Sequence, residues 1–345
     1  MRKTIILSAA LLMAAVGTQA KSWKIGPSSV TGMDFASINA AVGSSDVSAG
    51  DTLYLDQYYN ENAEQTVTKK VVIIGTGYDT SLTDEQVVAT LTSNLNLKAN
   101  NVTVKSVRLA HVYLYNDDCI IERCQTNDVK VSSSTAGINH VYSCYVLGVI
   151  CGYSDSNYSP FDIQNCCFVY NSNTSTIFNL TSSIFRNNVI IRSNGYYWEN
   201  YFCLINISNS EISNNIILNT YSSYYDRDLA DNVFNSGSGN SIEHNILSRT
   251  SALTYFPTNK IGFGGSSSEL FTQQGNYSEQ YKLAEKSAAK GYATDGGECG
   301  AHGGMFGCPS GGRPQYIPYF SKVVVGSRTE DGKLPVSVTI KIQDE

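Results

Sequence analysis

The stretch Glu211-Ile212-Ser213-Asn214-Asn215-Ile216-Ile217 carries one copy of a pattern that recurs between Val104 and Leu247. The pattern is an apolar residue, two mostly polar residues, then Asn, Cys or Val, then any residue, then an apolar residue. Successive fourth positions lie 17, 20, 22, 21, 28 and 30 residues apart. A unit of roughly 20 residues that lengthens without losing its phase indicates stacked coils with loop insertions. The fourth positions are Val107, Cys124, Cys144, Cys166, Asn187, Asn215 and Asn245.

These fourth positions predict a ladder of stacked side chains. If each copy is one coil of a parallel β-helix, equivalent residues in neighbouring coils lie about 4.8 Å apart. An Asn amide both donates and accepts, so stacked Asn side chains can bond along the ladder, while Cys fills the same column as a small apolar residue. Asn is also common in polar loops, but the phase of the flanking apolar residues favours the ladder. The predicted structural ladder is Cys124, Cys144, Cys166, Asn187, Asn215 and Asn245.

The first twenty residues have the features of a secretory signal peptide. Arg2 and Lys3 precede an apolar run over residues 4–16, and small or polar residues lead to a cleavage site after Ala20. No later apolar stretch approaches the length that spans a bilayer. We therefore expect a secreted or periplasmic protein without a membrane span.

The composition narrows the class of partner. Charged residues make up 16% of the chain, whereas the chain contains 28 Gly and 23 Tyr, as a loop-rich β protein requires. The net charge of −6 argues against nucleic acid, whose phosphates need clustered Lys and Arg. Because a solenoid grows by adding coils and needs no second core, we expect a single coil stack in a monomer.

The two ends of the stack have their own patterns. Residues 33–42 predict a short amphipathic helix, which would cap the N-terminal end together with apolar strands at residues 52–55 and 71–74. Beyond residue 312, two strand-like segments flank Glu330-Asp331-Gly332 and predict a β-hairpin. The predicted organisation is a signal peptide over 1–20, a β-helix over 21–312 and a hairpin tail over 313–345. We expect the tail to cover the C-terminal end of the stack or to dock along its side.

The helix, the strand Gly50–Leu55, the turn Val72–Gly77 and the coil ladder together resemble the pectin-lyase-like superfamily of exported bacterial proteins. Residues 281–301 are similar to the closing coil of such proteins, although Ala288 stands where they have a proline. The resemblance implies an all-β fold, a single-stranded right-handed parallel β-helix. It implies no single activity, because the superfamily contains lyases, hydrolases, esterases and adhesins.

The catalytic signatures of that superfamily are missing from this sequence. The pair Asp117-Asp118 lacks the other motifs of a polygalacturonase, and no acidic cluster with a matching arginine suggests a pectate lyase or pectin methylesterase. No motif indicates a metal or other cofactor, although calcium is compatible with the acidic loops. The sequence therefore leaves open whether the protein is an enzyme.

Long insertions begin at similar positions of the repeat, so we predict that they project from the same side of the stack. They would form one surface of aromatic and acidic loops, here called the loop face. Several Tyr residues follow the fourth positions by nine residues, and carboxylates follow two to four residues later. Tyr and Trp suit half-wet surfaces, so we expect this face to bind a polysaccharide or a cell-surface glycan. The alternative is that the rings pack against the flank of the stack. The predicted ligand-binding residues are Tyr153, Tyr196, Tyr197, Trp198, Tyr224, Tyr225 and Arg227.

Catalysis on the same face is an alternative function. Carboxylates on neighbouring coils lie about 5 Å apart, and those two coils apart about 10 Å, which brackets the separations in retaining and inverting glycosidases. The candidate catalytic residues are Glu199, Asp226 and Asp228 of a glycoside hydrolase or a polysaccharide lyase. A second alternative is a structural or adhesive solenoid without chemistry.

The nine cysteines and four histidines add further predictions. We expect the ladder cysteines to be buried free thiols, because stacked Cβ atoms point in parallel and lie too far apart for a disulfide. Cys299 and Cys308 are the candidate disulfide pair, and a metal site that adds His302 is a weaker alternative. The histidines at 140 and 244 are predicted to be structural, and His111 has no acidic partner nearby in the sequence.

Overall fold

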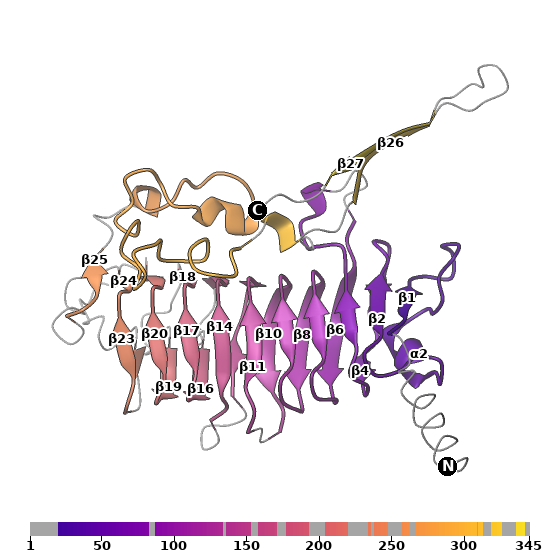
Figure 1. Cartoon of the computed structure of the whole chain (residues 1–345), viewed down its shortest axis with the longest axis horizontal. Coiled ribbons are helices and arrows are strands. Elements are labelled where there is room, and N and C mark those ends of the chain that lie inside the picture. The colour runs from indigo at the N-terminus through magenta and orange to yellow at the C-terminus, as the bar shows by residue number, and fades with distance from the viewer. Residues whose placement is uncertain are drawn as a thin grey trace, which may run out of the picture.

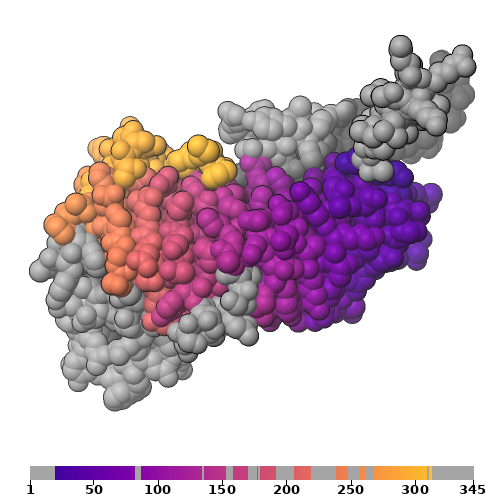
Figure 2. All heavy atoms as spheres, turned by 60° about the horizontal axis from the view of Figure 1, so that its bottom comes forward, coloured from indigo at the N-terminus to yellow at the C-terminus, as the bar shows by residue number. Residues whose placement is uncertain are grey.

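The chain forms an all-β solenoid of parallel strands stacked in two sheets, which confirms the predicted stacked coils (Figure 1). Figure 2 shows the coils following one another in chain order along the long axis. The computed structural model describes residues 20–82, 87–133, 136–152, 158–170, 177–192, 204–219, 234–235, 238–247, 257–261, 267–308, 310–312, 319–325 and 336–341.

Sheet A receives one short strand from each successive coil. Its strands pair in parallel, and the order in the sheet follows the order in the chain. The strands of sheet A are β1 (Ser22–Ile25), β2 (Thr52–Leu55), β5 (Val72–Ile74), β7 (Thr103–Lys105), β9 (Ile120–Glu122), β11 (Asn139–Tyr142), β14 (Phe161–Gln164), β17 (Ile184–Arg186), β20 (Glu211–Ser213) and β23 (Ser241–Glu243).

Sheet B contains the remaining strands of the coils. The seven-residue strand β10 pairs with both β12 and β13, so from that coil onward each long strand is divided into two. Its strands are β3 (Asn60–Glu61), β4 (Gln65–Val67), β6 (Thr90–Leu97), β8 (Arg108–Leu114), β10 (Gln125–Val131), β12 (Tyr145–Val146), β13 (Ile150–Cys151), β15 (Cys167–Tyr170), β16 (Ile177–Thr181), β18 (Val189–Arg192), β19 (Leu204–Ser208), β21 (Ile216–Asn219), β22 (Phe234–Asn235), β24 (Ile246–Leu247) and β25 (Lys260–Ile261).

The core consists of inward-pointing columns of apolar residues, one residue per coil. In sheet A, Ile121, Val141, Ile163, Phe185 and Ile212 stand in register, and each side chain is buried. Because side chains alternate between the two faces of a strand, the residues between them point outward. The core therefore fixes which residues of sheet A meet solvent.

The ladder is present, but the predicted Asn187 is not a member. The backbone N–H of Cys166 donates to Oδ1 of Asn188 (2.9 Å), and that of Asn188 donates to Oδ1 of Asn215 (2.8 Å). Asn245 and Asn259 continue the ladder, and Asn259 was not predicted. The prediction was wrong by one residue because the repeat can be aligned here in two ways, starting at Ile184 with Asn187 fourth or at Phe185 with Asn188 fourth. The structure selects the second alignment, since Phe185 is the residue that pairs with Ile163. The thiols of Cys124, Cys144 and Cys166 are buried and free.

One residue before each ladder position, the backbone adopts the left-handed conformation, with φ between 53° and 58°. This residue turns the chain from sheet A into sheet B, and Asn tolerates the conformation better than most residues. In the last five of these coils, its side chain forms a hydrogen bond with the segment that follows the last coil. We call these residues the turn row; they are Ser106, Arg123, Ser143, Asn165, Asn187, Asn214 and His244.

Residues 267–308 and 310–312, here called the strap, run back along the turn row toward the N-terminal coils (Figures 1 and 2). The contacts follow one another in reverse chain order. His244 Nδ1 bonds to Tyr292 O, Asn214 Nδ2 donates to Thr294 Oγ1, Asn187 Nδ2 donates to Glu298 O, Asn165 Nδ2 donates to Ala301 O, and Ser143 Oγ donates to Gly307 O.

The strap covers an apolar patch on the outer face of sheet B and forms a second core there. Cys167, Val189, Ile216 and Ile246 stand in register on that face and are buried against strap residues. This burial on both faces explains the continuous apolar runs of these strands. Gly300 has φ of +88°, and a Cβ there would lie 2.8 Å from Ile216 Cδ1, so the close approach requires glycine. Residues 281–301, which resemble a closing coil, thus lie in the strap, and none of the described strap residues pairs with the sheets of the stack.

The N-terminal helix α2 (Ile38–Gly43) is shorter than the predicted 33–42. Ser37 is its N-cap and accepts a hydrogen bond from Ala40 N, so the helix cannot begin earlier. Asp34, which lies within the predicted range but outside the helix, accepts a hydrogen bond from Lys24 N (2.7 Å). The 3₁₀ helices are η1 (Thr80–Leu82), η2 (Ser267–Glu269), η3 (Tyr277–Tyr281) and η4 (Ser310–Gly312).

The tail contains an antiparallel strand pair, β26 (Tyr319–Val325) and β27 (Val336–Lys341), with a register shift between Phe320 and Lys322. Figure 1 shows this pair standing away from the stacked sheets, far from β25 at the C-terminal end of the stack. The expectation that the tail covers that end is therefore wrong.

Candidate functional site

The loop face predicted to bind glycan lies outside the described residues. The loops leave and rejoin strands that are described, so their points of attachment are known. Residues 193–203 and 220–233 connect β18 to β19 and β21 to β22, whereas residues 153–157 follow β13 and lead toward β14. Residues 153–157 therefore leave the coil at a different corner from the other two loops. The predicted residues concerned are Tyr153, Tyr196, Tyr197, Trp198, Glu199, Tyr224, Tyr225, Asp226, Arg227 and Asp228.

The outer face of sheet A carries a continuous column of mainly polar residues, one from each strand. Strand register fixes its order, and the stacking repeat sets a spacing of about 4.8 Å between neighbouring positions. We call it the outer column; it contains Lys24, Tyr54, Ile74, Lys105, Glu122, Tyr142, Gln164, Arg186, Ser213 and Glu243.

Tyr142 is the centre of a hydrogen-bonded cluster on this face. Its hydroxyl donates to Asp162 Oδ2 (2.5 Å), and His140 Nδ1 lies 2.8 Å from the same hydroxyl. Gln164 Nε2 donates to Asp162 Oδ1 (2.7 Å). Burial opposes ionisation of Asp162, but hydrogen bonds from His140, Tyr142 and Gln164 outweigh it and lower the pKa of the carboxyl group. Burial and the neighbouring carboxylate both raise the pKa of Tyr142, so the tyrosine stays a neutral donor.

The strap adds apolar groups beside this cluster. The ring of Phe306 stacks on that of Tyr142, with centroids 4.2 Å apart and planes inclined by 10°. The neighbouring residue Met305 is 87% exposed. Phe306 is only half-buried, so part of its ring also meets solvent. Aromatic, apolar and hydrogen-bonding groups thus meet at the middle of the outer column.

The cations in the middle of sheet A are neutralised by carboxylates. Lys105 Nζ lies 2.6 Å from Glu122 Oε2. Arg186 forms a bidentate pair with Glu211, in which Nη2 lies 2.7 Å from both carboxylate oxygens, and Ser213 Oγ donates to Glu211 Oε1 (2.6 Å). Burial acts against ionisation of Glu211, yet the Ser213 and Arg186 bonds lower its pKa. These pairs leave the column able to accept and donate hydrogen bonds without an excess of positive charge.

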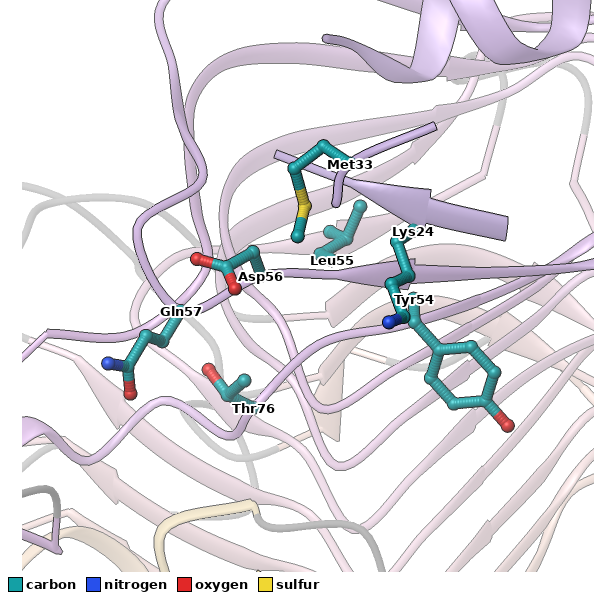
Figure 3. Close-up of a pocket in the computed structure, with 7 residues that line it drawn as sticks. All are labelled: Lys24, Met33, Tyr54, Leu55, Asp56, Gln57 and Thr76. Atoms are coloured by element: carbon teal, nitrogen blue, oxygen red, sulfur yellow. The ribbon is translucent and has the colours of Figure 1, made fainter. Parts of the chain in front are cut away.

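A cavity of about 280 Å³ opens at the N-terminal end of the outer column (Figure 3). Two column residues, Lys24 of β1 and Tyr54 of β2, line it, so the cavity and the column are continuous. Burial raises the pKa of Asp56 in its wall. The remaining lining residues are Met33, Leu55, Gln57 and Thr76.

A second titratable cluster lies on sheet B. His111 Nδ1 lies 2.8 Å from Asp128 Oδ2, which also accepts from Lys130 Nζ (3.0 Å). His111 has no acidic partner nearby in the sequence, but β8 and β10 pair in register and bring Asp128, 17 residues away, beside it. Despite opposing burial, the bonds from Val149 N, Lys130 and His111 lower the pKa of Asp128. Lys130 and Asp128 form an ion pair that His111 joins through a hydrogen bond, so the cluster is structural.

The predicted disulfide and its metal alternative are both wrong. Cys299 and Cys308 are free thiols. Cys299 Sγ donates to His244 O (3.4 Å), whereas Cys308 shares a hydrogen bond with Cys167, so the two lie against different coils. His302 Nε2 bonds to Ser278 O (2.8 Å). In the described part of the chain, no three His, Cys, Asp or Glu side chains are grouped to hold a metal ion.

Comparison of the chain with protein-family models, with curated proteins and with solved structures gives no match in any of the three. The resemblance to the pectin-lyase-like superfamily therefore stays a prediction. No helix within the described ranges is both long and apolar enough to cross a membrane.

The sequence pattern predicted a site on the loops and did not predict the outer column. The overlooked signal was the period-two alternation of Asn139-His140-Val141-Tyr142 and Phe161-Asp162-Ile163-Gln164, in which the second and fourth residues of each strand point outward. Phe306 could not be found this way, because its contact with Tyr142 spans 164 positions of the chain.

Proposed function

We propose that this protein binds an extended, uncharged polysaccharide along the outer column, as an exported member of the pectin-lyase-like β-helix proteins. The observation that carries the proposal is the column of mainly polar side chains, one from each strand of sheet A, with the Tyr142–Phe306 stack at its centre. The signal-peptide pattern of residues 1–20 supports an exported location, where glycans are the common extended polymers.

The regular spacing of the column suits a polymer better than a small molecule. Each coil contributes one residue to the column, about 4.8 Å from the next, which is close to the length of one sugar ring in an extended chain. The carboxylate of Asp162 and the amide of Gln164 can bond to hydroxyl groups, while Phe306 and Met305 can contact the apolar face of a ring. A linear glycan presents these same two kinds of surface along its whole length.

The charge of the column favours a neutral glycan over a polyanion. Lys105 and Arg186 are already held by carboxylates, and Asp162 and Glu243 add negative charge to the face. A polyanion would be repelled by these groups and by the net charge of −6 on the chain.

Binding to soluble polysaccharides in native affinity gels tests the proposal. Neutral polymers such as β-glucan, xylan and galactomannan are compared with polygalacturonate and alginate. We expect retardation by at least one neutral polymer and none by the polyanions. Phe306→Ala should weaken binding about tenfold by removing the apolar contact. Tyr113→Ala on sheet B removes a half-buried ring from another face and should leave binding unchanged.

The same gels distinguish the alternatives. Retention that depends on polyanions would contradict the neutral-glycan proposal. Absence of binding to every polymer would favour a structural or adhesive solenoid. New reducing ends or unsaturated products in the bound fraction would show that the protein also cleaves its ligand.

A further inference from the structure

The outer column is closed at its N-terminal end by the chain itself. The loop after β1 folds against the free edge of that strand, where Asp34 N and Phe35 N donate to Lys24 O (2.9 and 3.2 Å). Gly26 N donates to Phe35 O (3.1 Å), and Asp34 Oδ2 accepts from Lys24 N. No further coil precedes β1 in sheet A among the described residues. An extended ligand lying on the column must end or turn away at this position.

The cavity lies at this closed end, and its walls come from three successive coils. Lys24 stands on β1, Tyr54 and Leu55 belong to β2, and Thr76 follows β5. Figure 3 shows the Asp56 carboxylate between Met33 and the hydroxyl of Thr76, with Gln57 farther along the same side. At about 280 Å³ the space is of the size of one or two sugar rings and much smaller than a polymer needs.

The lining combines the groups that a sugar ring requires. Met33 offers an apolar surface, and the half-exposed ring of Tyr54 stands where the cavity meets the column. Polar groups are added by Gln57, Thr76 and Asp56; Asp56 Oδ1 also accepts from Tyr58 N (2.9 Å). The one ammonium of Lys24 and the one carboxylate of Asp56 balance, so the lining favours an uncharged ligand.

We propose that this cavity binds the terminal sugar ring of a neutral glycan whose following rings lie along the outer column. The inference rests on the proposed function and adds to it that the protein recognises chain ends. A short oligosaccharide supplies an end for every molecule, whereas a long polymer supplies few ends for the same mass. End recognition therefore predicts that the cavity matters more for short chains than for long ones.

The test compares two identical substitutions at different places. Gln57→Ala changes the cavity, and Gln164→Ala changes the middle of the outer column. Titration calorimetry measures binding of cellohexaose, xylohexaose, mannohexaose and maltohexaose, each beside its parent polymer. We expect Gln57→Ala to weaken hexasaccharide binding at least tenfold and polymer binding less than threefold, and Gln164→Ala to weaken both.

Each outcome decides a different point. If Gln57→Ala binds the hexasaccharide like the wild type while Gln164→Ala does not, the chain-end inference is wrong and the proposed function stands. Polymer binding without any hexasaccharide binding in the wild type overturns the inference in the same way. No binding of any probe overturns both. Asp56→Asn, which keeps an oxygen for Tyr58 N, provides a second cavity variant with the same expected pattern.

Discussion

The Oδ1 atom of Asn215 accepts two hydrogen bonds from Asn188, one from its backbone N (2.8 Å) and one from its Nδ2 (3.1 Å). The Oδ1 of Asn188 in turn accepts from Cys166 N on the preceding coil (2.9 Å). One buried amide thus connects three consecutive coils, and every polar atom of that side chain has a partner. A buried ladder of this kind stabilises the stack mainly because unpaired polar groups would be costly there.

Replacing Asn188 by Ala should lower the free energy of unfolding by about 2 to 4 kcal/mol, because Cys166 N loses its acceptor in a buried site. Chemical denaturation followed by circular dichroism measures the change. Asn187→Gly is the matched control: it retains the left-handed backbone and loses only the bond to Glu298 O, so about 1 kcal/mol is expected. Equal losses at the two positions would contradict the corrected ladder.

Asn165→Gly should loosen the strap without unfolding the coils. The Asn165 side chain donates to the carbonyl oxygens of Ala301 and Gly303, and glycine adopts its positive φ without strain. Limited proteolysis with mass spectrometry should detect faster cleavage within residues 292–308 and an unchanged pattern within residues 104–133. Ser133→Ala, far from the strap contacts, is the control. Equal cleavage rates in the variant and the wild type would show that the apolar contacts alone hold the strap.

Stability should fall at acidic pH as Asp162 and Glu211 become protonated. Both carboxyl groups have a lowered pKa in the folded protein, relative to ordinary values of 3.8 and 4.5. Their contribution is complete above those values and disappears as the pH falls through the lowered folded values. Thermal melts between pH 7 and pH 3 should show a smaller drop for Glu211→Gln, which is already less stable at pH 7. A drop as steep as that of the wild type would exclude Glu211 as a cause.

Thiol reagents should label none of the eight described cysteines in the folded protein. All eight are buried and free, and burial raises the pKa of Cys299 and of Cys151 to about 12. Iodoacetamide labelling before and after denaturation, with peptide mass spectrometry, measures this. We expect full labelling only after denaturation. A crosslinked peptide that joins Cys299 to Cys308 would show that the sequence-based pairing was correct.

The sequence predicts the stacked coils well, because the spacing of apolar residues within the repeat is a local signal that recurs in every coil. It could not choose between Asn187 and Asn188, because the choice depends on pairing with a strand 22 residues earlier. It also contained a sign of the strap that was not recognised. The runs Val189-Ile190-Ile191 and Ile216-Ile217-Leu218 do not alternate, which means that both faces of those strands are covered.

The candidate site was harder to predict than the fold. Alternation places His140, Tyr142 and Asp162 on one outward face once the register of β11 and β14 is known. No local pattern predicts that Phe306 reaches Tyr142, or that Lys24 and Thr76 line one cavity. Such contacts depend on the path of the chain around the coils, and loop-rich segments give little information about that path.

A stack of coils coupled only to its nearest neighbours melts piecemeal, fraying from its ends. The strap changes this expectation, because residues 292–307 bind turns from Ser143 to His244, at separations of 48 to 164 positions. The strap thus connects five coils, and unfolding of the last coil requires breaking strap contacts that also hold the earlier coils. The C-terminal half should therefore unfold in a single cooperative transition, and refold slowly, because the strap can attach only after all five turns exist.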